Sequence, residues 1–208
     1  MAQQPVSHAV NPGALELGGI EAVRRVDPNA LGILVFISSE AIFFASLIIT
    51  YIVARSGSNG GPTAHVLNVG TTAIFTVCLF ASSATMERVT AHLHRNDSAG
   101  VRRWLLITIA LGAIFLIGQG IEYTTLYRDS VTMGTNLWSS AFFTLTGFHG
   151  FHVLIGVTSM AIIASLVGPG PDHPRAGSAV HTISYYWHFV DAVWVVIFPV
   201  VYLWTLIS

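Results

Sequence analysis

The sequence has 208 residues, of which 53% are hydrophobic and 9% are charged, and its mean hydropathy is +0.67. Soluble globular domains carry about 25% charged residues, so the composition excludes a disordered chain, a disulfide-stabilised secreted scaffold and an ordinary soluble enzyme. The net charge is −1 and lysine is absent, which argues against nucleic-acid binding. We therefore expect an integral membrane protein.

Residues 1–28 are mostly polar, contain several glycines and prolines and lack a signal-peptide pattern, so we expect a surface tail or a partner-binding arm. A bilayer core about 30 Å thick is crossed by about 20 apolar residues in a helix. Five stretches of sufficient length follow the tail, at residues 31–54, 65–86, 104–123, 137–167 and 180–207. The sequence thus predicts an all-α, polytopic membrane protein in which residues 29–208 form one five-helix transmembrane domain.

Arginines are distributed unevenly between the two ends of these spans. Seven fall in the tail and in the second and fourth connections, whereas two fall in the first and third connections. Positively charged connections remain in the cytoplasm. We therefore expect a cytoplasmic N-terminus and a C-terminus on the outside.

Two glutamates lie within predicted spans, one in the middle of a span and one at its end. Glu40 lies in the middle of the first span, where a charged carboxylate is costly, so it must be neutral, paired or turned toward protein. It is either a packing group, a member of a proton or ion pathway, or a contact to a partner. Glu122 closes the third span beside Tyr123, a position typical of a helix end with an aromatic anchor.

Histidines mark the fourth and fifth spans. His149 and His152 are three residues apart and therefore share a helical face, which a metal or haem site can use. Structural metal sites normally have four ligands, so hydrogen-bonding histidines at a helix interface are the favoured interpretation. His188 and Asp191 have the same spacing and form either an imidazole–carboxylate pair or part of a relay.

Polar residues from the first, fourth and fifth spans fall at similar depth, in the middle half of the bilayer. They are Glu40, His149, His152, His188 and Asp191. If they converge, they form a buried polar layer inside the bundle, which is where intramembrane function usually lies.

Four motifs, in order, resemble segments of subunit III of the haem–copper respiratory oxidases, the cytochrome c oxidase subunit 3 family. The most specific is the run Tyr186–Trp194, which includes Trp187, His188 and Asp191. The others are Ser39–Phe44, Gln119–Tyr123, and Ala141–Phe143 together with His149–Val153. The resemblance covers residues 29–207 and is closest to the short, five-helix form of the family. Ala192 stands where the family usually has valine.

The resemblance implies a five-helix bundle with a lipid-filled V-shaped cleft in the plasma (inner) membrane of a bacterium. It also implies a non-catalytic subunit of a proton-translocating oxidase, with no catalytic residue, metal ligand or cofactor of its own. Haem and copper belong to the partner subunits I and II. Subunit III packs directly on subunit I, binds membrane phospholipids, and supports proton uptake and stability during oxygen reduction.

The same resemblance assigns roles to residues. Glu40 corresponds to the family's buried carboxylate, which supports proton uptake. The helix-interface and lipid-cleft residues are Glu122, His149, His152, Trp187, His188 and Asp191. Cytochrome c is the expected electron donor to the complex. Subunit III of a quinol oxidase, and a related protein associated with nitric oxide reductase, are alternatives within the family.

Two alternatives come from other functional classes. A small haem-b electron carrier would use His149, His152 and His188 as axial ligands, but such carriers need matched ligand pairs on facing helices. A proton-coupled transporter would use Glu40 and Asp191 as proton carriers. Transporters often contain inverted repeats and broken helices, and neither is evident in the sequence.

Overall fold

The computed structural model describes residues 28–57, 67–167 and 174–206. Within these ranges the chain forms five long helices and a 3₁₀ turn, without any strand. The elements are α2 (Pro28–Gly57), α3 (Val69–His94), α4 (Ser98–Arg128), α5 (Leu137–Leu166), α6 (Pro174–Val201) and η1 (Leu203–Leu206). All five helices are long and apolar enough to cross a membrane. This confirms the expected all-α, five-span fold, while the expected tail lies outside the described residues except for Pro28.

Several helices extend beyond the spans expected from hydropathy. The stretch 87–103, expected as a connection, is helical except at Arg95–Asp97. Helix α4 also continues five residues past Tyr123, to Arg128. Hydropathy marks only the part of a helix that matches the hydrocarbon core, whereas backbone hydrogen bonding continues into the polar interface until a capping residue ends it.

The turn between α3 and α4 is short because two residues favour it. Asn96 adopts the left-handed backbone conformation with φ of 53°, which asparagine tolerates better than most residues. Asp97 then caps α4, since its side chain accepts a hydrogen bond of 2.9 Å from the backbone N–H of Gly100. Helices α3 and α4 therefore form an antiparallel hairpin, and they make the most extensive helix pair in the bundle.

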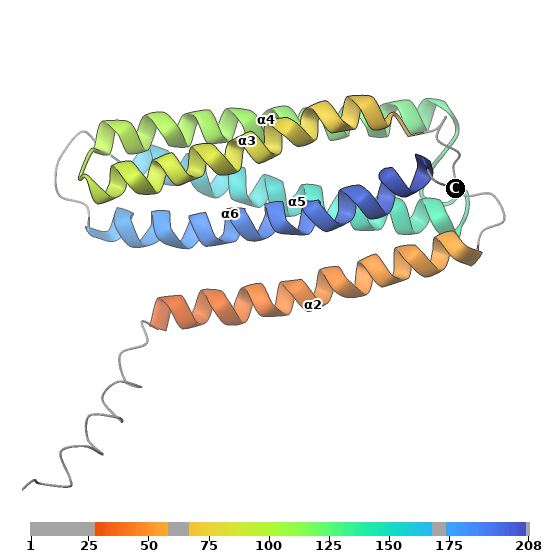
Figure 1. Ribbon diagram of the computed structural model, residues 1–208, viewed down its shortest axis with the longest axis horizontal. Helices are drawn as coiled ribbons and strands as arrows, with labels where there is room; N and C mark the ends of the chain where they lie inside the picture. Colours follow the sequence, from red (N-terminus) through yellow and green to blue (C-terminus); the bar gives the residue numbers. More distant parts are fainter. Residues whose placement is uncertain (1–27, 58–66, 168–173, 207–208) are drawn as a thin grey trace, which may run out of the picture.

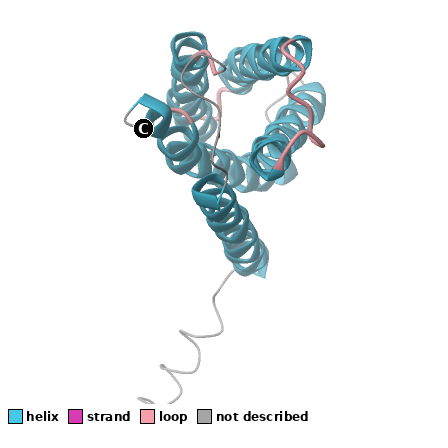
Figure 2. Cartoon of the chain, turned by 90° about the vertical axis from the view of Figure 1, so that its right-hand side faces the viewer, coloured by secondary structure: helices cyan, strands magenta, loops and turns pink. Residues whose placement is uncertain are grey.

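The five helices run roughly along one axis (Figure 1). Helix α6 packs against α2, α3 and α5, whereas the main contacts of α2 are with α5 and α6 only. The end-on view shows α2 on the outside of the group formed by the other helices (Figure 2). Large apolar side chains of α2 such as Ile42 and Val53 are more than half exposed, as expected for a helix that faces lipid.

Trp187 joins four helices at the centre of the bundle. Its fully buried indole on α6 donates a hydrogen bond of 3.0 Å to the hydroxyl of Ser82 on α3. The ring lies against Gly112 on α4 and Gly156 on α5, where even a methyl side chain would collide with it. These two glycines are therefore required for the close approach of the helices.

Candidate functional site

Glu40 and His152 form a pair between α2 and α5. Oε2 of Glu40 lies 3.1 Å from Nε2 of His152, and Nδ1 of the same imidazole lies 2.8 Å from the carbonyl oxygen of Phe148. Because a carbonyl only accepts hydrogen bonds, Nδ1 carries a hydrogen. One further proton must lie between Nε2 and the carboxyl, either on Glu40 as a carboxylic acid or on His152 as an imidazolium. Glu40, which needs a partner at membrane depth, therefore shares a proton with His152.

His149 has very different surroundings, although it lies only one turn from His152. Its imidazole is fully buried and stacks on the indole of Trp194, with Phe115 packed edge-on. Neither ring nitrogen has a hydrogen-bond partner among the described residues. His149 is therefore a ring in an aromatic cluster. The two histidines of the motif share no hydrogen-bond partner, although both rings contact Phe44.

The described part of the chain contains no group of three or more His, Cys, Asp or Glu side chains that could hold a metal ion. Both nitrogens of His152 are engaged, and Nδ1 of His188 is bonded to Ser83.

His188 and Asp191 are linked through a third residue. The hydroxyl of Ser83 on α3 donates a hydrogen bond of 2.5 Å to Oδ2 of Asp191, and its oxygen lies 3.0 Å from Nδ1 of His188. Nε2 of His188 lies 3.1 Å from Oε1 of Glu87, which is an ion-pair distance without hydrogen-bond alignment. Of the two alternatives for His188 and Asp191, a direct pair or part of a relay, the structure shows no direct bond between them but a link through Ser83. Ser83 and Glu87 are members of the site that the sequence did not indicate.

Glu122 makes hydrogen bonds inside the bundle, in addition to lying near the end of a membrane span. Its carboxyl accepts hydrogen bonds of 2.7 Å from Tyr202 and 3.3 Å from Thr72, so it connects α4 with the ends of α6 and α3. Beside it, between Gln119 and Trp194, lies a cavity of about 10 Å³, which is about the size needed for one water molecule.

The polar residues expected in one layer are thus divided between two contacts and one ring cluster. The structure brings Glu40 to His152, and it brings His188 and Asp191 to Ser83. His149 stands apart from both contacts. In place of a single convergent layer, the structure has two separate contacts, one between α2 and α5 and one between α3 and α6.

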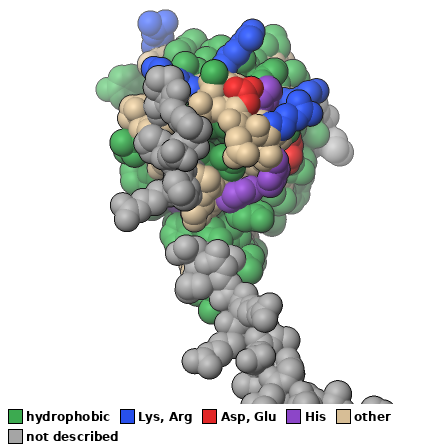
Figure 3. Space-filling view, turned by 90° about the vertical axis from the view of Figure 1, so that its left-hand side faces the viewer, with side chains coloured by type: hydrophobic (Ala, Val, Ile, Leu, Met, Phe, Trp, Pro, Cys, Tyr) green, Lys and Arg blue, Asp and Glu red, His purple; other side chains and the backbone are tan. Residues whose placement is uncertain are grey.

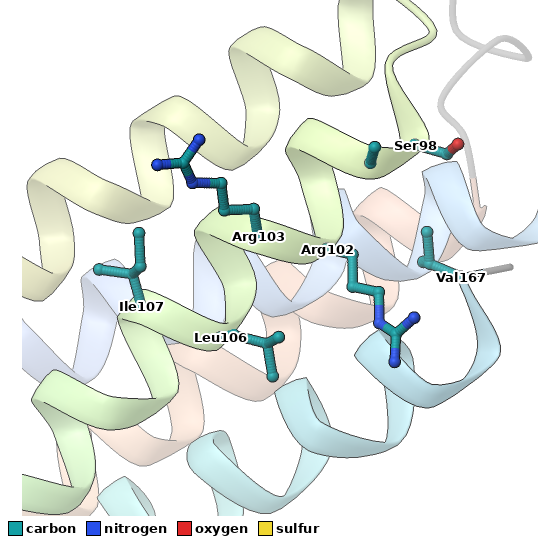
Figure 4. Close-up of a pocket in the computed structure, with 7 residues that line it drawn as sticks. Ser98, Arg102, Arg103, Leu106, Ile107 and Val167 are labelled. Carbon is teal, nitrogen blue, oxygen red and sulfur yellow. The ribbon is translucent and has the colours of Figure 1, made fainter. Parts of the chain in front are cut away.

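A larger recess of about 540 Å³ lies where α4 begins and α5 ends. Figure 4 shows the guanidinium of Arg102 directed toward Val167 at the end of α5, and that of Arg103 directed to the other side of α4. Leu106 and Ile107 form the apolar part of the wall. Cations above an apolar wall at the end of a membrane span suit a ligand with an anionic group and a hydrocarbon chain.

Comparisons with known proteins agree with this architecture. The chain matches the family model of cytochrome c oxidase subunit III over residues 19–206. It is 37% identical over 187 residues to cytochrome c oxidase subunit 3 of Corynebacterium diphtheriae, covering 88% of this chain and 91% of that relative. It is 34% identical over 193 residues to the probable cytochrome c oxidase subunit 3 of Nocardia farcinica, covering 92% and 95%. For cytochrome c oxidase subunit 3 of Synechocystis, the identity is 36% over 183 residues, covering 85% and 76%.

Proposed function

Because the chain belongs to the cytochrome c oxidase subunit III family, we propose that it supports oxygen reduction in a bacterial terminal oxidase whose electron donor is cytochrome c. The observation that carries this proposal is the match over nearly the whole helical domain. The chain is a non-catalytic subunit. Haem and copper are held by the partner subunits I and II, and this chain packs on subunit I in the bacterial inner membrane.

The arrangement of the arginines supports one orientation of the bundle. The end formed by the α3–α4 turn carries Arg95, Arg102 and Arg103, whereas Arg55 and Arg128 lie toward the opposite end. Since positive charge favours the cytoplasmic side, the α3–α4 turn faces the cytoplasm, and the end of α6 faces outward.

Glu40 supports proton uptake by the complex, and the pair with His152 gives this role a physical basis. The pair shares a proton, and the Glu40 side chain keeps 22% of its surface exposed, so it is not fully enclosed by this chain. We propose that Glu40 acts on proton uptake in the neighbouring subunit I and is not itself on the route of the pumped proton.

Phospholipid binding involves the recess at Arg102 and Arg103. Neither guanidinium has an ion-pair or hydrogen-bond partner in the described ranges, so each is available to a phosphate group on its own side of α4. The apolar side chains below them suit an acyl chain. We therefore propose an anionic phospholipid at the cytoplasmic end of α4.

The experiment that tests the proposed function is purification of the complex in mild detergent through a tag on this chain. We expect haem- and copper-containing subunits to co-purify, and subunit II to carry copper ligands, as in oxidases that accept electrons from cytochrome c. A reduced-minus-oxidised haem band from the isolated chain would contradict the proposal. A subunit II without copper ligands would overturn the assignment of the donor.

The lipid site has its own test. The complex with both Arg102→Gln and Arg103→Gln is expected to retain less anionic phospholipid than the native complex, as measured by mass spectrometry of extracted lipids. Arg128→Gln, at the other end of α4, is the matched control. Equal lipid retention in the double variant and the control would exclude the recess as the binding site.

A further inference from the structure

Helix α6 carries a line of polar side chains that faces α3. His181, Ser184, His188 and Asp191 are separated by three, four and three residues, which places them on one face of the helix. Side chains of α3 lie opposite three of them. The imidazoles of His94 and His181 are 5.4 Å apart between ring centroids, Glu87 lies opposite His188, and Ser83 lies opposite Asp191. We call this row the α3–α6 seam.

Exposure decreases along the inner part of the seam. The side chain of Glu87 is 70% exposed and that of His188 is 35% exposed, whereas Asp191 is 5% exposed. Glu87 lies seven residues from the end of α3, which corresponds to about 10 Å along the helix. The view of this end of the molecule shows histidine, acidic and basic side chains gathered there, with hydrophobic side chains around them (Figure 3). The seam therefore connects a polar end of the bundle with a buried carboxyl.

The hydrogen bonds of Ser83 fix the state of His188. A serine hydroxyl has one hydrogen, and Ser83 donates it to Oδ2 of Asp191. Nδ1 of His188, 3.0 Å from the same oxygen, must therefore be the donor in that contact. In the neutral imidazole, Nε2 then carries a lone pair, and it lies 3.1 Å from Oε1 of Glu87.

We propose that the α3–α6 seam is a proton-exchange path between the arginine-rich end of the bundle and Asp191. The Glu87–His188 contact is not aligned for a hydrogen bond, so the exposed Glu87 side chain must first rotate to align it. A proton on Oε1 of Glu87 then passes to Nε2 of His188, the Nδ1 proton passes to Oγ of Ser83, and the original Ser83 proton passes to Oδ2 of Asp191. Glu87 becomes a carboxylate, Asp191 becomes a carboxylic acid, and His188 changes from one neutral tautomer to the other. The reverse sequence returns the proton to Glu87.

Three other titratable groups, on α2 and α5, which also pack against α6, are engaged elsewhere. Glu40 on α2 and His152 on α5 are bonded to each other, and His149 on α5 is stacked on Trp194. The path consequently consists of Glu87, His188, Ser83 and Asp191. The inference goes beyond the proposed function, because it concerns proton exchange within this chain, and its failure would leave the oxidase assignment unchanged.

The test follows hydrogen exchange at Asp191 by infrared spectroscopy of the purified full chain after transfer to deuterated water. The Asp191 carboxylic C=O band is identified by its loss in Asp191→Asn or, if that variant does not fold, by isotope-labelled aspartate. We expect Ser83→Ala and His188→Phe to slow the deuterium shift of this band by about 100-fold, the lower range for a positioned proton carrier. Ser83→Thr, which keeps the hydroxyl, is expected to restore the native rate.

Ser82→Ala is the matched control, because Ser82 is the adjacent residue of α3 but is bonded to Trp187. It is expected to exchange at the native rate. Equal exchange rates in native protein and Ser83→Ala, or equal slowing in Ser82→Ala, would overturn the proposal. The proposal also fails if the Asp191 band does not develop at any pH at which the protein is folded.

Discussion

The imidazole of His149 stacks on the indole of Trp194, with ring centroids 4.7 Å apart and an angle of 26° between the ring planes. The contact joins α5 to α6 inside the core, and it is an aromatic contact without a hydrogen bond from the imidazole to any described residue. The indole N–H of Trp194 is satisfied by Thr76 at 3.0 Å. The stacked pair therefore contains one satisfied ring and one unsatisfied ring.

His149→Phe is expected to leave assembly intact and to raise the midpoint of thermal unfolding. The substitution keeps the stacked ring and removes a buried N–H group that has no partner. Leaving such a donor unsatisfied destabilises the folded state by about 1–3 kcal/mol. Thermal unfolding followed by circular dichroism measures the change. His152→Phe is the control and should lower the midpoint, because it removes the partner of Glu40. A lower midpoint in His149→Phe would show that the imidazole nitrogens have a polar partner in the complex.

Glu40→Gln is expected to retain assembly while sustained turnover declines mildly. Glutamine keeps the shape of the side chain and a hydrogen bond to His152, but it cannot exchange a proton. Glu40→Ala leaves Nε2 of His152 without a partner and should destabilise the α2–α5 contact by about 1–3 kcal/mol. Co-purification and oxygen consumption over many turnovers measure the two effects. If the glutamine variant is normal and the alanine variant does not assemble, Glu40 acts in packing alone.

Gly112→Ala is expected to destabilise the protein by about 1–3 kcal/mol, because the new methyl group collides with Trp187 in a tightly packed region. Gly120→Ala on the same helix is the matched control. A methyl group there meets no atom within 4 Å, and alanine improves helix propensity by about 1 kcal/mol. Thermal unfolding of the two variants should shift in opposite directions, and a shift in the same direction would exclude tight packing as the cause.

The α3–α4 turn is expected to lose stability in acid. The hydrogen bond from the backbone of Gly100, together with the hydrogen bond to His92, lowers the pKa of Asp97 below its ordinary value. A carboxylate whose pKa is lower in the folded state stabilises it fully above the unfolded value, and this contribution is lost as the pH falls through the folded value. The midpoint of thermal unfolding should fall as the pH is lowered from about 5 to about 2, a range that includes the ordinary pKa of aspartate. Asp97→Asn, which caps a helix without titrating, should show a weaker dependence on pH, and an equal dependence would contradict this account.

The membrane spans were predictable because length and apolar character are properties of each segment alone. The ends of the helices were less predictable from the sequence. The segment from Glu87 to His94 is the polar last part of α3. Its hydropathy does not distinguish a helix from a connection. The stop at Asn96 and the cap at Asp97 are local signals, and they give the helix end more accurately than hydropathy does.

The site shows where prediction from single segments stops. Burial of Glu40 calls for a partner, but the choice of His152 depends on how α2 packs on α5. The spacing of His188 and Asp191 indicates a common face, yet Ser83 comes from another helix and lies between them. A serine in a transmembrane helix normally bonds to its own backbone, so the sequence gives no signal for this role.

The Glu40–His152 pair also constrains how the protein is made. The two residues are 112 positions apart, so α2 leaves the ribosome and enters the bilayer well before α5 exists. During this interval the helix carries a carboxyl at mid-membrane without its imidazole, a costly arrangement for any span. We therefore expect biogenesis to proceed through a state in which α2 is inserted but undocked, and its attachment to be complete only once both of its main packing partners, α5 and α6, have been made.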